Sequence, residues 1–167
     1  YANIKTTNLP PHISDRFGWE EMVKQTYEIY SKLMLSSNEN IGILVNNYGQ
    51  GGAINLFGRK YHLPKPAGFY DWYYYETLRS HVFKENYLAI GIDSLHLKYI
   101  FENVIDCGIY EHPYCISFEN HKHFHYCSKP RFNLKSYWQV FHKMDKNFSE
   151  LIKTDFQEAL LYFNKHH

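Results

Sequence analysis

The clearest hydrophobic pattern in the chain is a short apolar run that stops at polar residues and glycines. Residues 41–45 read IGILV, and residues 46–52 read NNYGQGG. Apolar residues then return at helical spacing. Because a short continuous apolar run is typical of a strand buried on both faces, we predict a strand at 41–47 and a helix at about 50–60. This is the first strand–helix unit of a layered α/β domain.

The rest of the chain continues the alternation of strands and helices. Apolar positions at helical spacing predict a helix from Ser14 or Asp15 to about Leu35. Further strands are predicted at 87–92, 104–110 and 123–127, and further helices from Asp93 or Ser94 to about 103, at 134–143, and from 149 onward.

This alternation predicts an α/β fold: a single three-layer domain with a mostly parallel sheet flanked by helices and joined by right-handed crossovers. We expect residues 14–148 to form that domain. Residues 1–13 are a linker arm, and residues 149–167 are an additional C-terminal helix.

The glycine-rich corner after the first strand is a candidate ligand site. Ligands in such sheets bind beyond the carboxyl ends of the strands, and free N–H groups at a helix start attract anions. The glycines do not form a dinucleotide fingerprint, because Ile54 stands three residues after Gly51, where that motif needs Gly or Ala. The alternative is a tight turn that only packs helix against strand.

Length and composition limit the possible functions. The 167 residues suit one domain, and an apolar fraction of 44% indicates a globular chain. A net charge of +1 gives no electrostatic case for a nucleic-acid partner. No apolar run approaches the ~20 residues of a spanning helix. The chain begins at Tyr1, as an excised piece would.

Aromatic content is unusually high, at 19%. Residues 69–75 read FYDWYYY, which is too dense for every ring to be buried. Exposed rings with polar tips suit sugars, partner proteins or a membrane interface. Alternatively, the rings simply cover the end of the sheet.

One segment has the spacing of a metal site. If residues 121–127 are extended, His121, His123, His125 and Cys127 project from one face, where Zn²⁺ or Cu would find imidazole and thiolate ligands. No Asp or Glu is interleaved with them, and the alternative is a surface strand that merely carries histidines. We therefore predict no metal and no other cofactor.

The three cysteines, Cys107, Cys115 and Cys127, allow either one disulfide and a free thiol or three reduced side chains. Without a CxxC pair they do not form a zinc finger.

No residue has a clear catalytic signature. The carboxylates expected near the carboxyl edge of the sheet are Asp71, Glu76, Asp93 and Glu119. Asp93 is better explained as a helix cap. Glu119 lies in a connection where neither core nor cap obviously requires it. A nucleophile elbow and a protease-type cysteine motif are both absent.

An ordered series of motifs gives the chain a family resemblance. The series is DRFGWE at 15–20, NYGQGGAI at 47–54, YHLP at 61–64, YDWY at 70–73, Pro113-Tyr114 with Glu119-Asn120, Tyr126-Cys127, and Leu134 with Trp138. Over about residues 9–148, the chain resembles the soluble C-terminal domain of bacterial membrane glycosyltransferases of the protein-mannosyltransferase and aminoarabinose-transferase type. Two features depart from that pattern: residues 68–71 read GFYD where a His-Asn pair is usual, and the strand at 123–127 is normally apolar.

The resemblance implies a function for the parent protein. Such enzymes have a polytopic N-terminal half that takes a sugar from a polyprenyl-phosphate carrier, and their soluble domain lies on the extracytoplasmic (periplasmic) side of the inner membrane. Their acidic catalytic residues belong to the membrane half, so none is assigned here. We expect a non-catalytic accessory domain whose partners are the membrane half of the same polypeptide and a polyprenyl-phosphate sugar or acceptor glycan.

Ligand contacts are expected at the glycine corner, at the aromatic loop and around residue 119. The candidates are Tyr48, Gly49, Gln50, Gly51, Gly52, Trp72, Tyr73, Tyr74, Tyr114 and Glu119. Two alternatives are a stand-alone small α/β protein that binds a nucleotide or phosphorylated ligand at the Gly49–Gly52 turn, and a structural interaction module.

Overall fold

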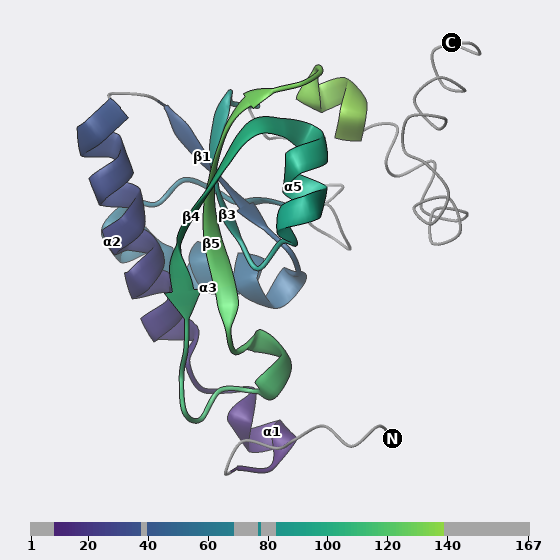
Figure 1. Ribbon diagram of the computed structural model, residues 1–167. Coiled ribbons are helices and arrows are strands. Elements are labelled where there is room, and N and C mark those ends of the chain that lie inside the picture. Colours follow the sequence, from purple (N-terminus) through teal and green to yellow (C-terminus); the bar gives the residue numbers. More distant parts are fainter. Residues whose placement is uncertain (1–8, 38–39, 69–76, 78–82, 139–167) are drawn as a thin grey trace, which may run out of the picture.

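A five-stranded sheet forms the centre of the computed structural model, which describes residues 9–37, 40–68, 77 and 83–138 (Figure 1). The strands are β1 (Ile41–Val45), β2 (Ala67–Gly68), β3 (Asn86–Ile90), β4 (Phe101–Tyr110) and β5 (Lys122–Pro130), in the order β2-β1-β3-β5-β4. β1 runs parallel to β2 and β3, while β5 is antiparallel to both β3 and β4. β4 therefore points the same way as β1, β2 and β3, and only β5 is reversed.

The α/β class predicted from the sequence is confirmed, and the sheet is mixed. The reversal of β5 has a simple cause. Between β4 and β5 the chain forms only the short 3₁₀-helix η2 (Ser117–Glu119), which is too short for a crossover back to the other edge. β5 therefore returns beside β4 in the antiparallel direction.

The helices follow the predicted order. They are α1 (Pro11–Ser14), α2 (Trp19–Ser37), α3 (Tyr48–Phe57) with the 3₁₀ turn η1 (Gly58–Tyr61), and α5 (Ser94–Ile100); residues 134–138 are also helical. Asp93 caps α5, as predicted, by accepting from the N–H groups of Leu95 and His96. The helix expected at 149–167 and most of the arm at 1–13 lie outside the described residues, so the predicted domain boundaries stay predictions.

The start of the first long helix was predicted wrongly. It begins at Trp19 and not at Ser14 or Asp15, because Gly18 has a φ of 90° that helical backbone does not allow. The carbonyl of Gly18 accepts a hydrogen bond of 2.6 Å from the hydroxyl of Tyr110 at the end of β4. Ser14 instead ends the separate helix α1.

Two apolar clusters cover opposite faces of the sheet. One joins Met22 and Val23 of α2 and Ile54 of α3 to the β1 side chains Ile41, Ile43 and Val45. The other joins Leu97 of α5 and Trp138 to Leu44 and Ala89. Successive residues of β1 alternate between the clusters, as side chains of a strand must. Each buried apolar side chain of this size contributes about 1.5–3 kcal/mol, so both clusters stabilise the sheet strongly.

The three cysteines, all within the described part of the chain, are free thiols, which leaves the second of the two predicted alternatives. In the same described residues, no helix has both the length and the apolar character needed to cross a bilayer.

Candidate functional site

Three connections meet at the carboxyl edge of the sheet, at the end nearest α1 in Figure 1. β1, β3 and β4 all end there, because they run in the same direction. Their continuations are residues 46–50, 91–94 and 111–121. This is the edge at which α/β domains bind ligands.

Glu119 joins two of these connections. Its side chain is only 4% exposed. Oε1 accepts from Asn47 Nδ2 over 2.6 Å, and Oε2 accepts from Gln50 Nε2 over 2.9 Å. The expectation that neither core nor cap requires Glu119 was wrong, because this carboxylate holds the glycine corner against the 111–121 connection.

Burial raises the pKa of Glu119, and the hydrogen bonds from Gln50 and Asn47 oppose that shift. The hydrogen-bond donors that the structure gives this carboxyl group are the side-chain amides of Asn47 and Gln50. Its geometry is that of a structural clamp.

The start of α3 is capped from within the chain. Asn47 is its N-cap, and its side chain accepts from the N–H of Gln50 over 3.0 Å. The N–H of Gly51 donates to the carbonyl of Asn47 over 3.1 Å. Two amide donors at this turn are therefore engaged, although the assignment of Tyr48 to Gly52 as ligand contacts stays a prediction.

Gly18 and Trp19, at the start of α2, pack onto the same corner. The Trp19 ring lies so close to Gly49 that a Cβ there would come within 2.9 Å of it. A Cβ on Gly18 would come within 2.9 Å of the Cβ of Cys115. Residues 15–20, 47–54 and 113–120, three segments that carry the family resemblance, therefore lie together at one edge of the sheet.

This edge presents exposed aromatic rings. Tyr48 is 69% exposed, Phe118 55% and Tyr114 47%. Phe17 is also exposed, and its ring meets that of Tyr114 edge-on at 6.4 Å. Tyr48 and Tyr114 were both predicted as ligand contacts, and both are accessible. Trp72, Tyr73 and Tyr74, together with Asp71 and Glu76, lie outside the described residues.

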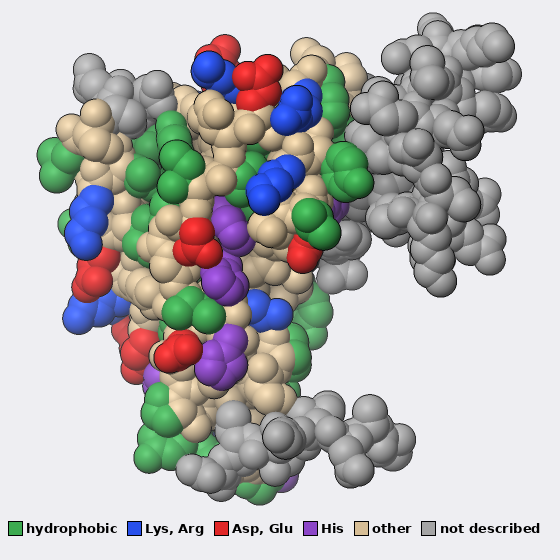
Figure 2. All heavy atoms as spheres, in the orientation of Figure 1, with side chains coloured by type: hydrophobic (Ala, Val, Ile, Leu, Met, Phe, Trp, Pro, Cys, Tyr) green, Lys and Arg blue, Asp and Glu red, His purple; other side chains and the backbone are tan. Residues whose placement is uncertain are grey.

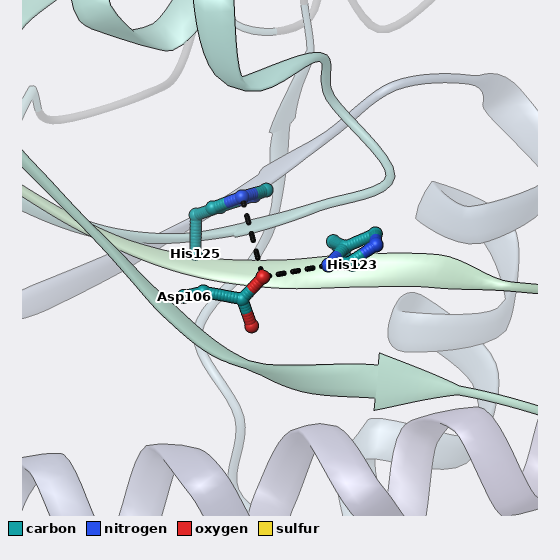
Figure 3. Close-up of side chains that lie close together, drawn as sticks. All are labelled: Asp106, His123 and His125. Atoms are coloured by element: carbon teal, nitrogen blue, oxygen red, sulfur yellow. Dashed lines mark hydrogen bonds and ion pairs between the residues drawn. The ribbon is translucent and has the colours of Figure 1, made fainter.

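A second cluster lies between β4 and β5, where Figure 2 shows histidine and acidic side chains gathered along the middle of this face. Asp106 of β4 is paired in register with His125 of β5. Asp106 Oδ2 accepts from His123 Nδ1 over 2.7 Å and lies 4.0 Å from His125 Nε2. In Figure 3 the carboxylate of Asp106 is turned toward both imidazole rings.

A β-bulge sets the direction of this carboxylate. The register shifts between Asp106 and Gly108, and the N–H of Gly108 donates to Asp106 Oδ1 over 2.7 Å. That hydrogen bond is the main reason the pKa of Asp106 is lowered, with His123 adding to the effect. Burial lowers the pKa of His125, which favours neutral imidazole. The cluster thus pairs an ionised carboxylate with a neutral ring.

An open hollow of about 440 Å³ adjoins the cluster. Its lining combines the end of β3, the start of α5 and the first half of β5. The residues are Gly91, Ile92, Asp93, Ser94, Asp106, His121, Lys122, His123 and His125.

The other two residues of the histidine motif have different partners. His121 Nδ1 lies 3.0 Å from Glu111 Oε1, on an exposed surface. The thiol of Cys127 is fully buried in the apolar cluster of α5, where burial raises its pKa to about 12.

Of the four residues in the predicted metal motif, the structure brings together His123 and His125. It adds Asp106, a residue that was not among the predicted ligands. The signal in the sequence was a polar residue near the middle of a strand, but the pairing partner could not be read from it.

In comparisons with known proteins, no family model, no curated protein and no solved structure matches the chain.

Proposed function

We propose that this chain is the extracytoplasmic accessory domain of a polytopic membrane glycosyltransferase. In this proposal the membrane half of the same polypeptide takes a sugar from a polyprenyl phosphate and carries out transfer. The present domain covers the mouth of the active site and helps to place donor or acceptor. It supplies no catalytic group itself.

One observation carries the proposal. Residues 15–20, 47–54 and 113–120 are far apart in sequence, yet they form one surface. Glu119 fastens the second of these segments to the third, and Trp19 covers Gly49. Three motifs that are separate in the sequence are therefore neighbours in the fold, at the edge where α/β domains bind ligands.

The chemistry of this surface suits a carbohydrate. Exposed rings such as Tyr48 and Tyr114 can stack on the apolar faces of a sugar, while their hydroxyls bond its polar rim. Buried Glu119 holds the backbone beneath those rings, so they would meet the ligand without a large loss of conformational entropy.

The nucleotide-binding alternative has less support. It needs free backbone donors at the start of α3, and the N–H groups of Gln50 and Gly51 already have acceptors in Asn47. Calorimetry with nucleotides would show saturable heat if that alternative were correct.

The decisive experiment uses the intact parent enzyme. We expect Tyr48→Ala and Tyr114→Ala, separately and together, to raise the KM for the polyprenyl-phosphate sugar or the acceptor while protein abundance stays unchanged. Tyr99→Ala is the matched control, because Tyr99 is a tyrosine on α5 whose exposed fraction, 54%, lies between those of Tyr114 and Tyr48. Unchanged kinetics in the double variant would reject this surface as the contact. A parent gene without a series of hydrophobic spans of about 20 residues would reject the family.

A further inference from the structure

A buried histidine with one unpartnered ring nitrogen is the starting point for a second site. His125 is 6% exposed, and its Nδ1 is the one buried side-chain nitrogen or oxygen without a hydrogen-bond partner among the described residues. Its Nε2 lies 4.0 Å from Asp106 Oδ2, which is beyond hydrogen-bond reach. A buried ring nitrogen without a hydrogen-bond partner is costly, so a missing partner is expected.

The neighbours of His125 are metal-ligand types in a suitable arrangement. Asp106, His123 and His125 each offer one ligand atom, and the three atoms lie within 4.8 Å of one another. Zinc bonds of about 2.0–2.2 Å in tetrahedral geometry place ligand atoms roughly 3.4 Å apart. The measured separations from Asp106 Oδ2, 2.7 Å to His123 and 4.0 Å to His125, lie on either side of that value. Side-chain shifts of less than about 1 Å would make them equal.

The surroundings already provide what a metal site needs beyond its ligands. The N–H of Gly108 holds Asp106 Oδ1 and thereby orients Oδ2 toward the two imidazoles, as outer-shell partners do in metalloproteins. The hollow of about 440 Å³ adjoins all three side chains, so water or a ligand can reach a further coordination position.

We propose that Asp106, His123 and His125 form a binding site for a divalent transition-metal ion. Asp106 Oδ2, His123 Nδ1 and His125 Nε2 are the ligands, and at least one coordination position opens into the hollow. Two imidazoles and one carboxylate with open positions suit Zn²⁺ and Fe²⁺. This site does not depend on the proposed function, and either can fail without the other.

Zinc titration of the full chain tests the site. His166 and His167 are replaced by alanine in every sample, so that the terminal histidines do not contribute to binding. With Zn²⁺ as the only ligand, calorimetry should show one ion per chain with micromolar or tighter affinity. Zn²⁺ should also raise the temperature of unfolding, because it binds the folded state.

Three variants and one control identify the ligands. Asp106→Asn, His123→Ala and His125→Ala should each weaken zinc binding by more than about tenfold. Far-ultraviolet circular dichroism of each metal-free variant checks that it folds. His62→Asn, which changes an exposed histidine after η1, should bind zinc like the chain that carries only the His166 and His167 substitutions.

If that background chain shows no saturable zinc binding, the proposal is overturned. Undiminished binding in folded His123→Ala and Asp106→Asn would overturn it as well. If Fe²⁺ under anaerobic conditions binds more tightly than Zn²⁺ at the same three ligands, the site stands and the ion is iron.

Discussion

At the scale of single residues, Glu119 joins two connections at the carboxyl edge of the sheet. It receives one hydrogen bond from each of Asn47 and Gln50, and almost no water reaches it. Removing the carboxylate leaves the buried amide of Gln50 and the half-buried amide of Asn47 without this acceptor, and an unsatisfied buried donor costs about 1–3 kcal/mol.

We therefore expect Glu119→Ala to lower the free energy of unfolding by about 2–4 kcal/mol in urea titrations. Glu102→Ala, at an exposed position of β4, is the control and should change it by less than about 0.5 kcal/mol. An equally small loss for Glu119→Ala would mean that the clamp does not hold the corner.

The pH dependence gives a second check on Glu119. Its pKa in the folded state is raised above 4.5 because it is buried, so above that pH the folded chain binds more protons than the unfolded one. The contribution of Glu119 protonation to the free energy of unfolding is fully present below pH 4.5 and is lost as the pH rises through the pKa of the folded state. The stability gap between the wild type and Glu119→Ala should thus narrow from pH 4.5 to neutral pH. A gap that widens would mean that the hydrogen bonds outweigh burial and lower the pKa.

At the scale of elements, two glycines of helix α3 differ in how closely other atoms pack against them. A Cβ on Gly52 would meet no atom within 4 Å, whereas one on Gly49 would come within 2.9 Å of the Trp19 ring. Packing therefore explains Gly49 and does not explain Gly52.

Gly52→Ala should stabilise the chain by about 0.5–1 kcal/mol, because alanine loses less entropy than glycine within a helix. Gly49→Ala is the matched variant and should destabilise it. Thermal unfolding of both measures this. Under the proposed function, a loss of sugar transfer in the Gly52→Ala variant would indicate that Gly52 is needed for contact with a ligand.

At the scale of the whole molecule, the sheet is held from both faces. Trp138 lies in the cluster of α5, with no exposed surface, and its Nε1 donates to the carbonyl of Gly68 at the end of β2. This contact links the last described helical turn to the edge strand across 70 residues.

Trp138→Ala should therefore cost about 3–5 kcal/mol of unfolding free energy, through the cavity and the lost hydrogen bond. Urea unfolding followed by circular dichroism measures it. Lys135→Ala, on the exposed side of the same turn, should leave the midpoint unchanged. A small effect for Trp138→Ala would mean that residues 134–138 are not part of the cooperative unit.

Features that depend on residues close together in the sequence were predicted, and features that depend on distant residues were not. The strands at 41–45 and 86–90 and the cap at Asp93 follow from short-range patterns, and they were predicted within a few residues. The start of α2 was missed because Gly18 is fixed by a distant hydroxyl, that of Tyr110. β2 was missed because two residues carry no periodicity.

The α/β class follows from the sequence alone, since alternating apolar strands and amphipathic helices have few ways to bury their apolar faces. The contacts of Glu119 with the glycine corner and of Asp106 with His123 and His125 became visible only in the folded chain. Those contacts join residues on different strands and loops, and a pairing register with a bulge cannot be read from either segment alone.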